Sequence, residues 1–199
     1  KQNGELPHLL IIEDTKDVVI FLEEMLQKQY KITTAYDGEA GIDIALKEVP
    51  DIIISDVMMP KKDGIEVVRT LKKDVRTSHI PIILLTARGD QEGKLEGLEV
   101  GADAYLVKPF NQKELFIRLR KLIEIRQRLQ QKYKGLASFT NTSISVPTND
   151  PELQFLQKLE QVVKENIGNE NFKVEPYLCR AMLMSRPQLY RKIKALLDK

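Results

Sequence analysis

The chain has 199 residues, of which 42% are hydrophobic and 30% charged, and its formal net charge is +2. This composition is ordinary for a globular protein and excludes disordered, collagen-like and disulfide-scaffolded chains. No apolar run approaches the roughly 18 residues that a membrane-spanning helix needs. The single cysteine, Cys179, cannot form an internal disulfide, and no leader sequence opens the chain. We therefore expect a protein of the reducing cytoplasm.

The small net charge conceals an uneven distribution along the chain. Residues 1–110 carry 14 basic against 20 acidic side chains, whereas residues 111–134 carry 8 against 2 and residues 172–199 carry 7 against 2. A basic C-terminal end is compatible with a polyanionic partner such as DNA.

Five short runs rich in apolar and β-branched residues recur through the first two thirds of the chain. The predicted strands are His8–Ile12, Lys31–Ala35, Asp51–Ser55, Pro81–Thr86 and Ala104–Val107. Segments with helical period lie between them, the first carrying Val18 to Leu26 and the second opened by Asp37 or Gly38. Wholly apolar runs such as Ile52–Ile54 require burial on both faces. We therefore predict an α/β fold with a doubly wound, five-stranded parallel sheet.

Polar residues of particular types follow these strands. They are Glu13, Asp14, Asp56, Thr86 and Lys108. In a doubly wound sheet, ligands bind beyond the carboxyl ends of the strands, so we expect these side chains to converge. Crowded carboxylates need a compensating cation, and oxygen ligands suit Mg²⁺. Asp56 could then attack a phosphoryl group while Lys108 neutralises its oxygens.

Each acidic residue also has an ordinary interpretation when it is considered alone. Asp56 could be a turn residue at a strand end, and Asp14 could cap the first helix. The combination of three carboxylates, a threonine and a lysine at successive strand ends favours a site.

The motifs that contain these residues resemble the receiver domain of two-component response regulators. The resemblance covers roughly Leu6 to Lys134 and implies a flavodoxin-like fold. The motifs are Ile12–Asp14, Ile54–Pro60 with Asp63–Gly64, Leu85–Ala87 and Val107–Phe110.

The resemblance also implies a role for each matching residue. Asp56 would accept a phosphoryl group from a histidine kinase, and Lys108 would contact that group. Mg²⁺ would be bound by Glu13, Asp14 and Asp56 with the backbone carbonyl of Met58. Thr86 and Tyr105 match the family's switch pair, and the Lys108–Pro109 bond would be cis.

A long helix is predicted from Asn111 to about Lys134, with Gly135 ending it. Its end could be a solvated connector or a short coiled coil in a homodimer. Residues 135–149 have linker composition. We accordingly divide the chain into a receiver domain at 1–134, a linker at 135–149 and a helical domain at 150–199.

The last segment begins with a helix-start signature at Asp150–Glu152, and Gly168 is expected to stop that helix. A helix from about Val174 to Met182 and another from Gln188 to Leu197 then flank a tight turn, with Ser185 as N-cap. The alternative is a small helical hairpin with a solvated basic face.

The stretch Leu178–Leu196 resembles the first helix-turn-helix of AraC-type transcription factors. That resemblance makes Tyr190 a core or backbone contact. It also offers Arg186, Gln188 and Arg191 as DNA contacts. The exposed polar and basic face expected on the second helix, which comprises Gln188, Arg191, Lys192 and Lys194, adds Lys192 and Lys194 to these candidates. Because the second helix-turn-helix of that family would follow Lys199, we expect weak DNA binding by this chain.

We therefore expect a phosphoacceptor regulator, not an enzyme, that controls DNA binding. An alternative is the C-terminal receiver and DNA-binding portion of a membrane hybrid histidine kinase, which a chain without an initiator methionine permits. A phosphatase with an aspartyl nucleophile fits less well, because it needs a carboxylate where Met58 stands.

Overall fold

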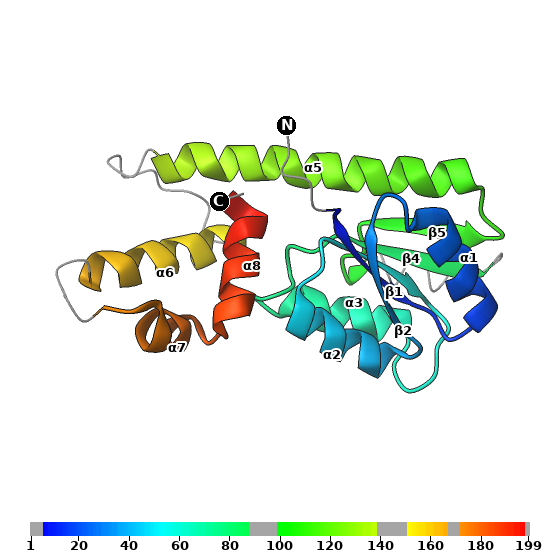
Figure 1. Cartoon of the computed structure of the whole chain (residues 1–199), viewed down its shortest axis with the longest axis horizontal. Helices are drawn as coiled ribbons and strands as arrows, with labels where there is room; N and C mark the ends of the chain where they lie inside the picture. The colour runs from blue at the N-terminus through cyan, green and yellow to red at the C-terminus, as the bar shows by residue number, and fades with distance from the viewer. Residues whose placement is uncertain (1–5, 88–98, 139–150, 167–171, 198–199) are drawn as a thin grey trace. The chain divides into compact units, whose positions relative to one another are not determined.

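The computed structural model describes residues 6–87, 99–138, 151–166 and 172–197 (Figure 1). The chain divides into two compact units, residues 1–126 and residues 127–199, which are described separately. Within the described residues, no helix combines the length and the apolar character that crossing a membrane requires.

The first unit is built on a sheet of five parallel strands. The strands are β1 (His8–Ile12), β2 (Lys31–Ala35), β3 (Ile52–Asp56), β4 (Ile82–Ala87) and β5 (Ala104–Lys108). Their order in the sheet is β2-β1-β3-β4-β5, and every neighbouring pair is parallel. The predicted doubly wound, flavodoxin-like α/β fold is confirmed.

Helices cover both faces of the sheet in this unit, as the alternation of buried side chains requires (Figure 1). The helices are α1 (Lys16–Leu26), α2 (Gly38–Glu48), α3 (Gly64–Lys73) and α5 (Gln112–Ser138). Leu10 and Ile53 pack with residues of α2 and α3 on one face. Their chain neighbours Leu9 and Ile54 pack with residues of α1 and α5 on the other face.

Two aspartates cap the helices that start near the carboxyl edge of the sheet. The Asp37 side chain accepts a hydrogen bond from the Ala40 N–H at 2.8 Å, and that of Asp63 accepts one from the Glu66 N–H at 2.8 Å. Each bond satisfies a helix-terminal donor, which stabilises a helix by about 1 kcal/mol. These caps fix where α2 and α3 begin.

The long helix α5 continues through Gly135 to Ser138, so the prediction that Gly135 ends it is wrong. A glycine inside a helix costs only about 1 kcal/mol, which neighbouring helix-forming residues can outweigh. Arg126 ties the middle of α5 to the sheet, because its guanidinium donates to the Asp51 backbone carbonyl and lies 3.4 Å from Asp51 Oδ1. Asp51 Oδ2 in turn accepts the His8 N–H at 2.8 Å.

The second unit contains the small helical segment. It comprises α6 (Pro151–Asn166), the short segment η1 (Val174–Leu178), α7 (Cys179–Met182) and α8 (Arg186–Leu197). Glu175 has extended backbone angles, φ −107° and ψ 131°, so η1 contains a kink and is not a regular helix. Buried side chains of α6, α7 and α8 share one core, which includes Phe155, Met182 and Leu189. Most of the expected linker, and the expected helix stop at Gly168, lie outside the described residues.

A tight turn joins α7 to α8. Leu183 adopts the left-handed conformation at φ 53°, and the Met184 N–H donates a hydrogen bond to the Cys179 carbonyl at 3.0 Å. Ser185 caps α8 as expected: its Oγ lies 3.5 Å from the Gln188 N–H, and its own N–H donates to Gln188 Oε1 at 3.0 Å. This reciprocal pair is a capping box.

Candidate functional site

Three carboxylates meet at the point where the strand order of the sheet reverses. Glu13 and Asp14 directly follow β1, and Asp56 ends β3, the strand that pairs with β1. One oxygen atom from each of the three lies within 4.8 Å of the others. Such a switch point is where doubly wound sheets bind their ligands.

Glu13 is fully buried, and both of its carboxylate oxygens have partners. Oε1 accepts the Thr15 N–H at 3.2 Å, and Oε2 accepts a hydrogen bond from Lys108 Nζ at 2.6 Å. A buried carboxylate needs such partners, because an unpaired buried charge is strongly destabilising.

Lys108, the last residue of β5, is the cation of the site. Its Nζ lies 3.1 Å from Asp56 Oδ2 as well as 2.6 Å from Glu13 Oε2. Burial is the largest influence on the pKa of Lys108 and lowers it, but the hydrogen bonds and charges of Glu13 and Asp56 together outweigh it. The pKa is therefore raised, and the ammonium remains charged at neutral pH. The Lys108–Pro109 bond is cis, as the resemblance implied.

Asp56 is only 7% exposed and is held by its surroundings. Its Oδ1 accepts the Val57 N–H at 2.9 Å. Gly64, at the start of α3, passes so close that a Cβ atom there would lie 2.1 Å from the Asp56 carbonyl oxygen. A side chain at position 64 would therefore displace the end of β3. Met58, two residues beyond Asp56, is 70% exposed.

The donor set fits a hard divalent cation. Three carboxylates within 4.8 Å of one another offer oxygen ligands only, which Mg²⁺ prefers. A single lysine leaves an excess of negative charge on these acids, so a further cation would be attracted to them.

Thr86 and Tyr105 lie on the same face of neighbouring strands. Thr86 is 1% exposed near the end of β4, and Tyr105 is 7% exposed in β5, where it pairs in register with Leu84. Among the described residues, the Tyr105 hydroxyl has no hydrogen-bond partner. Burial, with a smaller contribution from Asp103, raises the pKa of Tyr105 to about 12.

Residues 9–120 match the response regulator receiver domain, and this match covers more than half of the chain. The chain belongs to this family. The receiver domain comprises β1 to β5 and the first part of α5, so the acidic edge lies within the matched segment.

Relatives of the receiver domain occur in two kinds of protein. Histidine kinase P4 of Formosa agariphila is 39% identical over 94% of this chain, which spans only 13% of that protein. The response regulator ArlR of Staphylococcus aureus is 40% identical over 59% of this chain and 53% of its own length. This chain thus spans about half, or much less, of the curated relatives that it matches.

A solved relative is the receiver domain of a sensor histidine kinase from Pseudomonas aeruginosa. It is 30% identical, with a TM-score of 0.57, over 60% of this chain and 98% of its own. Its active-site cleft coordinates a magnesium ion.

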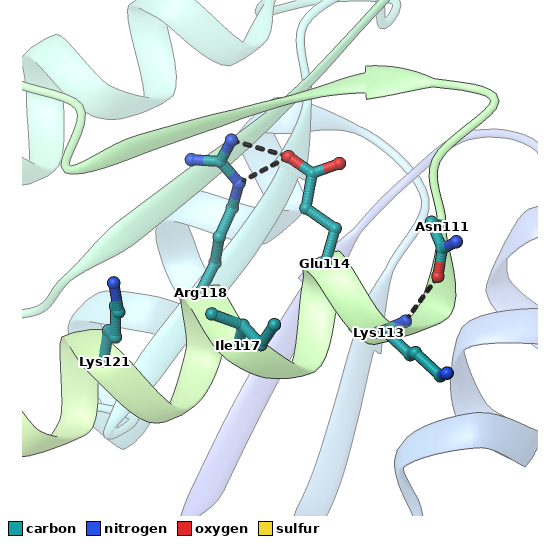
Figure 2. Close-up of a pocket in the computed structure, with 6 residues that line it drawn as sticks. All are labelled: Asn111, Lys113, Glu114, Ile117, Arg118 and Lys121. Atoms are coloured by element: carbon teal, nitrogen blue, oxygen red, sulfur yellow. Dashed lines mark hydrogen bonds and ion pairs between the residues drawn. The ribbon is translucent and has the colours of Figure 1, made fainter.

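A pocket also lies along the first turns of α5 in the receiver unit. Figure 2 shows Glu114 accepting hydrogen bonds from the Arg118 guanidinium at 2.6 and 3.1 Å, beside Ile117. The remaining lining residues are Asn111, Lys113 and Lys121. None of the three carboxylates lines this pocket, so it is separate from the acidic edge.

The candidate DNA contacts are divided between different faces of α8. Arg186, Arg191 and Lys194 are exposed, and Gln188 is partly buried with its Oε1 in the capping box. Lys192 is 0% exposed, so the prediction that it lies on the exposed basic face is wrong. Lys192 follows Leu189 by three residues, which places it on the same buried face of α8.

One other expectation concerns Tyr190. It is 60% exposed and so does not lie in the core, whereas its alternative role as a backbone contact stays a prediction. Sequence reasoning gave no role to Thr15, and it named Gly64 and Glu152 only as members of a motif and of a helix-start signature. The Asp63–Gly64 motif could have revealed Gly64, whereas no sequence signal connects Glu152 with Lys192, its partner 2.9 Å away.

Proposed function

We propose that this chain is a phosphorelay receiver in which Asp56 accepts a phosphoryl group from a histidine kinase with the help of Mg²⁺. The observation that carries the proposal is the position of Lys108 Nζ, 3.1 Å from Asp56 Oδ2 and 2.6 Å from Glu13 Oε2. This arrangement puts a fixed cation beside the carboxylate that would react. It also leaves Asp14 exposed at the rim for a metal.

The proposed reaction is an in-line transfer. An oxygen of Asp56 attacks the phosphorus of a kinase phosphohistidine; the P–N bond breaks, a P–O bond forms, and the imidazole leaves. Lys108 balances the charge on the transferred oxygens as a compact point charge. A bound Mg²⁺, held by Glu13, Asp14, Asp56 and the Met58 carbonyl, would add to this neutralisation.

Thr86 and Tyr105 would convert the new charge into a change of shape. The Thr86 hydroxyl can hydrogen-bond a phosphoryl oxygen, and a shift of Thr86 would alter the space beside the Tyr105 ring. Among the described residues, the Tyr105 hydroxyl has no hydrogen-bond partner that would hold it in place. This supports the proposal that the Tyr105 side chain can adopt more than one conformation.

Acetyl phosphate and Mg²⁺, followed by intact mass measurement, test the proposal. We expect one phosphoryl adduct on the wild type and on Asp43→Asn, a matched change at an exposed aspartate of α2, and none on Asp56→Asn. Turnover of acetyl phosphate without an adduct would instead support a phosphatase. An absence of reaction would indicate a receiver fold without its chemistry.

We further propose that the output is DNA binding through the AraC-type helix-turn-helix formed by α7 and α8. The exposed basic residues Arg186, Arg191 and Lys194 support this role. Homodimer formation through the end of α5 would place two such segments on one DNA. Single-residue replacement of Arg191 by alanine should weaken binding to duplex DNA if this output is correct.

This chain could be part of a separate response regulator or of a hybrid histidine kinase. The similarity to Histidine kinase P4 over 94% of this chain favours the hybrid histidine kinase. In it, the receiver and the helical segment would be parts of one polypeptide with the kinase. Sequencing the gene on both sides of this coding segment tests this. A reading frame that continues upstream into a kinase core supports the hybrid, and a start codon just upstream supports a separate regulator.

A further inference from the structure

Lys192 is a fully buried lysine in the middle of α8. Its side chain is 0% exposed, and its Nζ forms an ion pair with Glu152 Oε2 at 2.9 Å. The same nitrogen lies over the ring of Phe155, 4.9 Å from the ring centroid. Both partners belong to α6, so one side chain of α8 reaches two residues of another helix.

The placement of Lys192 follows from helix geometry. Leu189, Lys192 and Leu196 are spaced by three and four residues, which puts them on one face of α8, and all three are buried. Arg191 and Lys194 lie on other faces and are exposed. Two lysines only two residues apart therefore occupy opposite environments.

A buried ammonium is tolerated only where other groups replace its water. The Glu152 carboxylate, only 13% exposed itself, supplies the opposite charge, and the face of the Phe155 ring adds a favourable quadrupole. Glu152 and Phe155 are three residues apart and so lie on the same side of α6. Lys192 thereby holds the first turns of α6 against the middle of α8.

We propose that Lys192 is a positioning residue that sets α8 against α6, and that it makes no contact with nucleic acid. This inference rests on the proposed DNA-binding function of α8. In this arrangement, Arg186, Arg191 and Lys194 contact the DNA phosphates, while Lys192 pairs with Glu152 inside the protein. Replacing Lys192 then changes the affinity for DNA only by changing the orientation of α8.

Lysine reactivity in the full chain tests the burial directly and requires no DNA. With a limiting amount of an acetylating ester and peptide mass spectrometry, we expect Lys194 to be modified and Lys192 to be protected. Glu152→Gln should make Lys192 reactive, because the buried ammonium loses its counter-charge. Equal reactivity of Lys192 and Lys194 in the wild type would overturn the proposal.

The salt dependence of binding to a random-sequence DNA duplex tests the second half of the inference. Lys194→Met should lower the slope of log affinity against log salt by about one, the effect of losing one phosphate contact. Lys192→Met, the same change two residues away, should leave the slope unchanged even where affinity falls. Circular dichroism of each variant checks that the helices remain.

The outcomes separate this inference from the proposed function. If the wild type does not bind the duplex, DNA binding is contradicted, and the protection of Lys192 still decides whether it is a positioning residue. If Lys192→Met and Lys194→Met lower the slope of log affinity against log salt by the same amount, Lys192 contacts phosphate and the inference is wrong.

Discussion

Glu13 and Lys108 are 95 residues apart in the chain, yet Glu13 Oε2 accepts a hydrogen bond from Lys108 Nζ at 2.6 Å. This contact joins the carboxyl ends of β1 and β5, although β3 and β4 lie between these two strands in the sheet. It couples the stability of the receiver to the cation that the proposed phosphoryl transfer requires.

Replacing Lys108 by methionine should therefore weaken both properties. The change leaves the fully buried Glu13 without its cation, and we expect a loss of about 1–3 kcal/mol in the free energy of unfolding, measured in urea without metal. Phosphorylation by acetyl phosphate should slow sharply. Lys113→Met, at an exposed lysine of α5, is the control and should leave both quantities unchanged. Equal urea midpoints for Lys108→Met and the wild type would show that the contact is unimportant.

The ionisation of Tyr105 gives a prediction about alkaline pH. Burial raises the pKa of Tyr105 from 10.0 to about 12, so the folded protein holds this proton more tightly than the unfolded chain does. The free energy of unfolding should then fall as the pH rises from 10 towards 12. Tyr105→Phe should lack this part of the decline. The difference between the ultraviolet titrations of the two proteins isolates the residue, and a midpoint near the ordinary value would contradict its burial.

Gly64→Ala should disturb the site without removing any reactive group. Its Cβ would lie 2.1 Å from the Asp56 carbonyl oxygen, so the end of β3 must shift, at a cost of about 1–3 kcal/mol. We expect slower phosphorylation of Asp56 as well as a lower melting temperature. Gly101→Ala is the comparison, because at φ 95° it is strained but meets only Lys72 Cγ at 3.9 Å. It should lower the melting temperature and leave the phosphorylation rate unchanged.

Leu183→Gly should stabilise the second unit. Leu183 is 83% exposed at φ 53°, so glycine would relieve left-handed strain of ~1–2 kcal/mol and lose little packing. The greater conformational entropy of glycine in the unfolded chain offsets ~0.5–1 kcal/mol of that gain. Val49→Gly relieves similar strain at φ 46°, but it removes a side chain that is only 7% exposed and should destabilise. Urea unfolding of both variants checks the opposite signs.

The strands could be predicted from the sequence because their residues are apolar and their ends are polar. The bounds of β1 and β2 match the predicted His8–Ile12 and Lys31–Ala35. β3 and β4 are shifted by one residue at both ends, and β5 is one residue longer at its carboxyl end. Parallel strands bring their carboxyl ends to one edge, so the meeting of Glu13, Asp14 and Asp56 could also be foreseen.

The second unit is harder to predict from the sequence, because a charged side chain in a helix is usually exposed. Lys192 shares the helical period of Leu189 and Leu196, but its partner Glu152 is distant in the sequence and in another helix. Periodicity identifies the buried face of a helix, whereas the group that compensates a buried charge depends on tertiary packing. The ion pair between Arg126 and Asp51 could not be predicted from the sequence for the same reason.

The most direct test of the account is to locate the phosphoryl group. After treatment with acetyl phosphate and Mg²⁺, borohydride reduces an acyl phosphate to an alcohol, which peptide mass spectrometry can assign to one residue. We predict the reduced side chain at position 56 alone, dependent on Mg²⁺. Reduction at Glu13 or Asp14, or a stable adduct on another kind of side chain, would contradict the assignment of Asp56 as phosphoacceptor.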